Sequence, residues 1–135
     1  MMWAGLMLAG GNNKWLGKFD LTNVEDGILT ADEISQMDLS DTKLVVLSAC
    51  ETAKGKMDPV DGIYGLQRAF KIAGVRTIIM SLWKVQDEAT YDLMTHFYTY
   101  LSNGIERHEA LWKAMMIIKE KYKDPYYWAS FIMLD

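Results

Sequence analysis

The hydrophobic residues of this chain fall into short continuous runs and longer periodic stretches. Four runs predict β-strands, over residues 4–9, 44–48, 75–82 and the aromatic-rich 126–134. The second and third runs are apolar at consecutive positions, which is typical of strands buried on both faces. Residues 27–29 predict a further short extended piece.

Other stretches carry apolar residues at helical spacing. The helices that we expect cover residues 33–37, 63–73, 88–101 and 106–122. Thr30 and Glu33 have the spacing of a capping box, so they predict the start of the first helix. Gly74 stands where a glycine ends the second helix, and Asp87 is a suitable N-cap for the third.

The order of these elements predicts an α/β fold. Strand 44–48, helix 63–73 and strand 75–82 form a strand–helix–strand unit, whose crossover is almost always right-handed. The two strands are therefore expected to run parallel and to end at the same edge of the sheet. The whole order predicts one domain over residues 1–135, a three-layer αβα sandwich with a mostly parallel sheet.

Composition narrows the function classes. The chain has 135 residues, half of them hydrophobic, and a formal net charge of −4, so it lacks the basic surface that nucleic acid requires. No apolar run reaches the ~18 residues of a membrane span. One cysteine and no secretory signal favour a reducing compartment, which we expect to be the cytoplasm.

That cysteine, Cys50, is the candidate reactive group. It follows the predicted strand 44–48, and open α/β sheets place their ligands at the carboxyl edge of the strands. Ser81, Trp83 and Asp87 leave the next strand on the same side, so we expect them to line a substrate site with the thiol. Two alternatives stay open from position alone: Cys50 as a small buried hydrophobe, and Asp87 as a plain helix cap.

A thiol nucleophile also needs a base, and neither histidine of the chain is an obvious one. His96 and His108 fall within or near the start of predicted helices, not at the end of a strand. We interpret both as ordinary helix histidines that are solvated or half-buried.

Several segments together resemble the CHAT family, caspase-like cysteine peptidase domains that often follow tetratricopeptide repeats. The central one is Leu-Val-Val-Leu-Ser-Ala-Cys-Glu-Thr at 44–52. The others, in chain order, are 4–10, 26–34, 62–70, 73–74, the 81–85 stretch with Asp87, Ala89 and Thr90, then 97–98, 110–111 and 125–131. They span nearly the whole chain.

The resemblance implies a caspase-like fold and a cysteine endopeptidase of proteins or peptides, without metal or cofactor. Cys50 would be the nucleophile of a Cys–His dyad, and Asp87 would receive a basic substrate side chain, as a similar stretch does in separases. The family's histidine precedes the segment that resembles 4–10, so it would lie before residue 1 together with its strands. We therefore expect a partial domain, inactive alone, that depends on an upstream repeat region or a partner chain.

One departure from the family and one alternative function remain. The family usually has Gly after Cys-Glu-Thr, where this chain has Ala53. The alternative is a non-catalytic scaffold or regulatory module that uses the same fold for protein contacts. A sheet edge left open by the missing strands could also pair with another copy of the chain, since open edges recruit strands.

Overall fold

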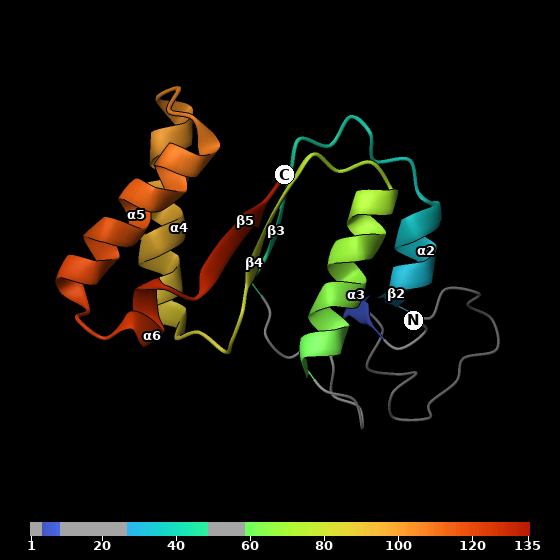
Figure 1. Ribbon diagram of the computed structural model, residues 1–135, viewed down its shortest axis with the longest axis horizontal. Helices are drawn as coiled ribbons and strands as arrows, with labels where there is room; N and C mark the ends of the chain where they lie inside the picture. The colour runs from blue at the N-terminus through green and yellow to red at the C-terminus, as the bar shows by residue number, and fades with distance from the viewer. Residues whose placement is uncertain (1–3, 9–26, 49–58) are drawn as a thin grey trace. The chain divides into compact units, whose positions relative to one another are not determined.

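The computed structural model describes residues 4–8, 27–48 and 59–135 and has an α/β architecture (Figure 1). The predicted turn and loop over 10–26 lie outside these residues, as does Cys50. The elements are β1 (Gly5–Met7), β2 (Ile28–Thr30), α2 (Ala31–Gln36), β3 (Leu44–Leu47), α3 (Pro59–Ile72), β4 (Thr77–Ser81), α4 (Asp87–Ser102), α5 (Arg107–Lys121), α6 (Pro125–Trp128) and β5 (Phe131–Leu134).

The chain packs as two compact units. The first comprises Met1–Val45 and Ala49–Ile78, and the second comprises Val46–Ser48 and Ile79–Asp135. Each has its own apolar interior. Buried side chains of the first include Ile34, Leu66, Phe70 and Val75, and those of the second include Ile79, Met80, Leu93, Phe97, Leu111, Ile118 and Phe131.

In the first unit, β1 and β2 pair antiparallel, and β2 continues directly into α2. The predicted capping box is confirmed. The Thr30 hydroxyl accepts a hydrogen bond from the Glu33 N–H at 3.2 Å, and the Thr30 N–H donates to the Glu33 carboxylate at 2.7 Å. Two backbone donors that would otherwise lack partners are satisfied, so the short helix has a defined start.

The predicted end of α3 is also confirmed. Gly74 follows the helix with φ +100°, a conformation that residues with a side chain rarely adopt. A Cβ there would lie 3.0 Å from the Cα of Ser40, so the glycine is needed for space as well. The Lys71 ammonium donates to the Arg76 carbonyl at 2.6 Å and fixes the turn that leads into β4.

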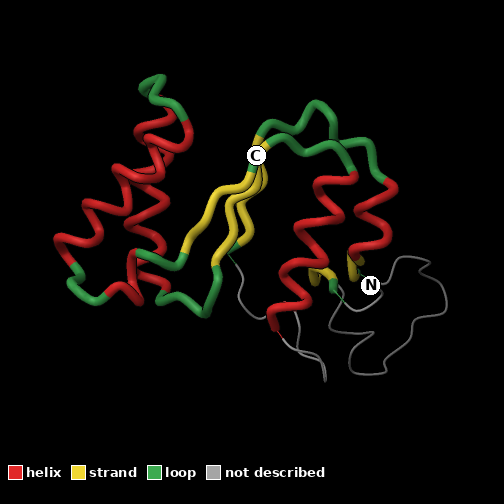
Figure 2. Tube along the Cα trace, in the orientation of Figure 1, coloured by secondary structure: helices red, strands yellow, loops and turns green. Residues whose placement is uncertain are grey.

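The second unit contains the helical hairpin of α4 and α5 (Figure 2). Asn103 and Gly104 end α4, as predicted, and Gly104 has φ +81°. The two helices run antiparallel: Lys121 near the end of α5 donates to Asp92 near the start of α4 at 2.5 Å. Their buried faces carry Ala89, Leu93 and Phe97 on α4, and Ala110, Leu111, Ala114 and Ile118 on α5.

Three strands form the larger sheet in the order β3-β4-β5 (Figure 1). The segments that enter β3 and β4 lie side by side, since the Arg76 N–H donates to the Thr42 carbonyl, so these strands run parallel. The Leu82 N–H donates to the Ser130 carbonyl, which joins the end of β4 to the start of β5. β5 therefore runs antiparallel to β4.

The described strands are thus mostly antiparallel, and the expectation of a mostly parallel sheet is not confirmed. Two further predictions need correction. β3 is half-buried along its length, whereas only β4 is buried at every position. The strand predicted over 126–134 begins only at Phe131, because Asp124 and Pro125 start the short helix α6 instead.

The physical reason for the second error lies in the Asp124–Pro125 pair. Proline is favoured at the first position of a helix, where its missing N–H costs nothing, and aspartate is a strong N-cap. The Asp124 carboxylate accepts a hydrogen bond from the Tyr126 N–H at 2.9 Å.

No helix in the described part of the chain is long and apolar enough to cross a bilayer.

Candidate functional site

The described part of the predicted site is the segment from the last residue of β4 to the first residue of α4. It carries Ser81, Trp83 and Asp87, all in the second unit. Cys50 and the neighbouring Ala53 fall outside the described ranges, so the structure gives no position for the predicted nucleophile. The following geometry concerns the substrate-binding candidates alone.

The site segment begins where β4 leaves the core. Ser81, the last residue of β4, is 2% exposed, whereas Leu82 beside it is 39% exposed. The chain therefore passes from interior to surface within one residue. The hydrogen bond from the Leu82 N–H to the Ser130 carbonyl, 2.8 Å long, fixes this exit point against the residue that precedes β5.

Tyr126 holds the next part of the segment at two points. The indole N–H of Trp83 donates to the Tyr126 carbonyl at 3.0 Å, and the Tyr126 hydroxyl donates to the Lys84 carbonyl at 2.6 Å. The rings of Trp83 and Tyr126 also stack, with centroids 6.5 Å apart. Each such hydrogen bond contributes roughly 0.5–1.5 kcal/mol, so the loop has a defined shape despite its exposure.

Asp87 is the first residue of α4, not its N-cap, which corrects our prediction. The N-cap is Gln86, whose side chain makes no capping hydrogen bond. Asp87 is exposed, and its carboxylate has no hydrogen bond or ion pair within the described residues. A carboxylate in the first helical turn interacts favourably with the helix dipole.

The neighbouring acidic groups of α4 are already engaged. Lys121 lies 2.5 Å from Asp92 and 3.8 Å from Glu88. The hydrogen bond to Asp92, with a smaller contribution from Tyr122, raises the pKa of Lys121 to about 12. Within the described ranges, Asp87 differs from Glu88 and Asp92 in that its carboxylate makes no ion pair.

The two histidines lie away from Asp87 within the second unit. His96 is half-buried in α4, nine residues beyond Asp87, or roughly 13 Å along the helix axis. His108 lies at the start of α5, and the antiparallel hairpin places it beside the far end of α4, roughly 20 Å away. Neither is positioned to act on a group bound at Asp87.

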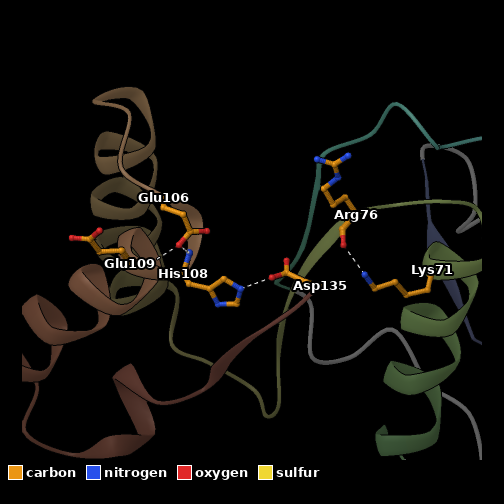
Figure 3. A network of polar contacts seen from close by, with 6 residues as sticks. All are labelled: Lys71, Arg76, Glu106, His108, Glu109 and Asp135. Atoms are coloured by element: carbon orange, nitrogen blue, oxygen red, sulfur yellow. Dashed lines mark hydrogen bonds and ion pairs between the residues drawn. The ribbon is translucent and has the colours of Figure 1, made fainter.

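His108 instead takes part in a surface pair with Asp135 (Figure 3). Its ring Nε2 lies 2.5 Å from Asp135 Oδ2, and this hydrogen bond raises the pKa of His108. The Glu106 carboxylate accepts hydrogen bonds from the N–H groups of His108 and Glu109, and so caps α5. The interpretation of His108 as an ordinary helix histidine is consistent with this structural role.

Sequence reasoning missed the role of Tyr126, which we had assigned to a strand. The signal was present in the Asp124–Pro125 pair, which predicts a helix start and hence a different orientation for Tyr126.

In the part of the chain that the structure describes, no group of three or more His, Cys, Asp or Glu side chains could hold a metal ion.

Comparison with known proteins gives two results. The family model of the CHAT domain matches residues 2–135. Tetratricopeptide repeat protein 28 of Mus musculus and that of Homo sapiens are each 32% identical over 117 residues, which is 85% of this chain. The chain spans only 5% of the length of either relative. No solved structure matches.

Proposed function

The chain belongs to the CHAT domain family, and on that premise we propose that it is the carboxyl-terminal part of a cysteine endopeptidase domain. The observation that carries the proposal is the family match over residues 2–135, which covers both compact units. The finer fold that we propose is a caspase-like three-layer αβα sandwich, in a single domain. The parallel pair β3 and β4, joined through α3, supports it.

In the proposed reaction, the Cys50 thiolate attacks the carbonyl carbon of a peptide bond. The bond to nitrogen breaks, the amine leaves with a proton from a general acid, and a thioester remains on the sulfur. Water then attacks the thioester, which releases the carboxylic acid and returns the thiol. These steps require acid–base catalysis but no metal or cofactor.

We propose that the acid–base group comes from outside these 135 residues. The resemblance matches neither His96 nor His108 to the family's His-Gly pair. His96 lies nine residues beyond Asp87 on α4, and His108 lies at the start of α5. The source would be the family's upstream segment or a partner chain. The relatives are tetratricopeptide repeat proteins, which supports an upstream repeat region.

Asp87 is the proposed selector of a basic substrate side chain. Its carboxylate is exposed and has no partner in the described residues, and the helix dipole favours its charge. Trp83 would form an apolar wall beside the aliphatic stem of the substrate lysine or arginine. Ser81 would support the segment from the interior, because it is 2% exposed.

The test compares the 135-residue chain with a chain extended by the coding region that precedes it. We expect the extended chain to cleave peptides with a basic residue before the scissile bond and to lose this activity on Cys50→Ala. The chain of 135 residues should give no turnover, although its thiol can still be alkylated, with the pH dependence of a free thiol near ~8.5. Cys50-dependent turnover by the 135-residue chain alone would contradict the need for an outside base.

Asp87→Asn in the extended chain tests the selectivity. We expect kcat/KM for basic peptides to fall about a hundredfold, because the loss of one partner of a desolvated charge pair costs roughly 2–5 kcal/mol. Glu88→Gln is the matched control, since Glu88 already lies near Lys121. Equal losses of kcat/KM in both variants would show that Asp87 does not select the basic side chain of the substrate.

A scaffold function is the second candidate. It is favoured by the positions of the two histidines, neither of which serves the site segment. An extended chain with a slowly reacting Cys50 and no peptidase activity would support the scaffold over the peptidase.

A further inference from the structure

The loop between β4 and α4 is held at each end by regular secondary structure. At its start, the Leu82 N–H donates to the Ser130 carbonyl at 2.8 Å, beside the end of β4. At its end, the Gln86 carbonyl accepts hydrogen bonds from the Thr90 N–H at 3.0 Å and the Thr90 hydroxyl at 2.9 Å. Residues 83–85 belong to neither element, so their conformation depends on contacts with other parts of the chain.

Tyr126 makes three contacts with this middle part of the loop. Its hydroxyl donates to the Lys84 carbonyl at 2.6 Å, and its own carbonyl accepts from the Trp83 indole N–H at 3.0 Å. The two rings also stack, with 22° between their planes. Tyr126 thus fixes the main chain at Lys84 and the ring of Trp83. Only Val85 and the N-cap residue of α4 lie between Lys84 and Asp87, so the same contacts set the path of the chain into Asp87.

Tyr126 is itself held in place by α6 and by the end of α5. The Asp124 carboxylate accepts a hydrogen bond from the Tyr126 N–H at 2.9 Å and so caps α6. The Tyr127 ring meets the Tyr126 ring edge-on, with centroids 5.3 Å apart, and stacks on Tyr122 with centroids 5.0 Å apart. Edge-to-face and offset-stacked arrangements are the favoured geometries of aromatic pairs. The Tyr126 ring is therefore ordered before any ligand binds to the loop.

We propose that Tyr126 is a positioning residue of the substrate site, which sets the places of Trp83 and Asp87 for the basic side chain of a peptide. The inference rests on the proposed peptidase function and deepens it. Tyr126 acts through the loop and not on the reacting atoms. A binding group that is ordered in advance raises affinity, because the cost of ordering it is not met at the moment of binding. The effect is therefore expected in substrate binding and not in the chemical step.

The test is the cleavage of peptides by the extended chain, with Tyr126→Phe and Tyr127→Phe as matched variants. Each change removes one hydroxyl, but the Tyr127 hydroxyl makes no hydrogen bond within the described residues. Tyr126→Phe should lower kcat/KM for peptides with a basic residue before the scissile bond about fivefold, since one hydrogen bond contributes roughly 1 kcal/mol. The loss should appear as a higher KM with kcat nearly unchanged. An unchanged KM, or an equal rise of KM in Tyr127→Phe, would overturn the proposal.

A double change separates positioning from general support of the fold. If Tyr126 acts by placing Asp87, then adding Tyr126→Phe to Asp87→Asn should lower kcat/KM less than about twofold further, because the group that it places is already lost. The full fivefold loss in the Asp87→Asn background would mean that the two residues act independently. That outcome would overturn the positioning role.

A ligand without a scissile bond distinguishes failure of this inference from failure of the proposed function. Benzamidine carries a planar cation like that of arginine, and it binds without catalysis. Even if the extended chain cleaves no peptide, we expect its dissociation constant for benzamidine to be about fivefold higher in Tyr126→Phe than in Tyr127→Phe. Equal dissociation constants in the two variants would overturn the positioning role alone. A parent chain that neither cleaves basic peptides nor binds benzamidine would overturn both proposals.

Discussion

Two helix starts in this chain are built in opposite ways. At α2, the Thr30 hydroxyl and the Glu33 carboxylate satisfy each other's backbone donors in a closed capping box. At α4, the Gln86 side chain makes no capping bond, although a strong capping residue, Asp87, stands one position later. The first start uses its polar groups for local stability, whereas the second leaves a carboxylate exposed.

The other helix starts support this contrast. Glu106 caps α5 through two backbone N–H groups, and Asp124 caps α6. Among the starts for which the structure describes the capping side chain, α4 alone does without one. A helix start without a capping side chain is less stable, so the start of α4 is expected to contribute less to the free energy of folding than the capped starts. Polar side chains satisfy backbone N–H groups at the start of α2, whereas the Gln86 side chain satisfies none at the start of α4.

The largest effect is expected at the closed start. Thr30→Ala removes the hydroxyl that accepts the Glu33 N–H, and we expect a loss of about 1–2 kcal/mol in the free energy of unfolding. Gln86→Ala, the matched change at α4, should alter it by only a few tenths, because no capping bond is lost. Urea unfolding of both variants measures the difference. Equal losses would show that Gln86 caps α4 in solution, which would break the comparison.

Asp124→Ala tests whether the N-cap of α6 controls the structure of the loop that precedes α4. We expect a loss of about 1 kcal/mol, because the Tyr126 N–H loses its carboxylate partner. Tyr126 also holds Trp83 and Lys84, so amide hydrogen exchange should become faster over residues 82–86. Ser35→Ala in α2 is a control that should leave this exchange unchanged. Unaltered exchange over residues 82–86 would show that the Asp124 cap of α6 does not hold the site segment in place.

Several features of the fold could be predicted from sequence because their signals were local. The capping box at Thr30, the glycine at the end of α3 and the bounds of α5 depend on residues within one helical turn of each other. The burial of β4 follows from its continuous apolar run.

Two features could not be predicted because neighbours distant in sequence decide them. β3 has the same aliphatic character as β4, yet it is half-buried because only β4 lies between two described strands. Trp83 was predicted as a site residue, but the hydrogen-bond partner of its indole, Tyr126, is 43 positions away, and no local pattern links the two. At α4, the sequence contains a suitable cap, and only the backbone placement shows that it is one residue too late.

Closing the open start of α4 should have a moderate effect. Gln86→Asp places a strong capping residue at the N-cap, and we expect a gain of about 0.5–1 kcal/mol in the free energy of unfolding. Gln86→Asn separates the cap from the added charge, since asparagine caps as well as aspartate does. Thermal unfolding of the three chains measures the gain. A loss of stability in both variants would show that the exposed start of α4 cannot accept a side-chain cap.

The smallest effect is expected at the capped start of α5, where the His108 ring contacts Asp135. Both side chains are more than half exposed, so solvent weakens the pair. The hydrogen bond raises the pKa of His108 above its ordinary value of 6.5, so the folded chain holds the proton more tightly than the unfolded chain. The stabilisation is therefore fully present below pH 6.5 and is lost as the pH rises through the folded-state pKa. Asp135→Asn should lower the melting temperature slightly at acidic pH and leave it unchanged at alkaline pH, where His108 is neutral in both chains. A difference independent of pH would mean that Asp135 acts through backbone contacts, and the start of α5 would then owe its stability to Glu106 alone.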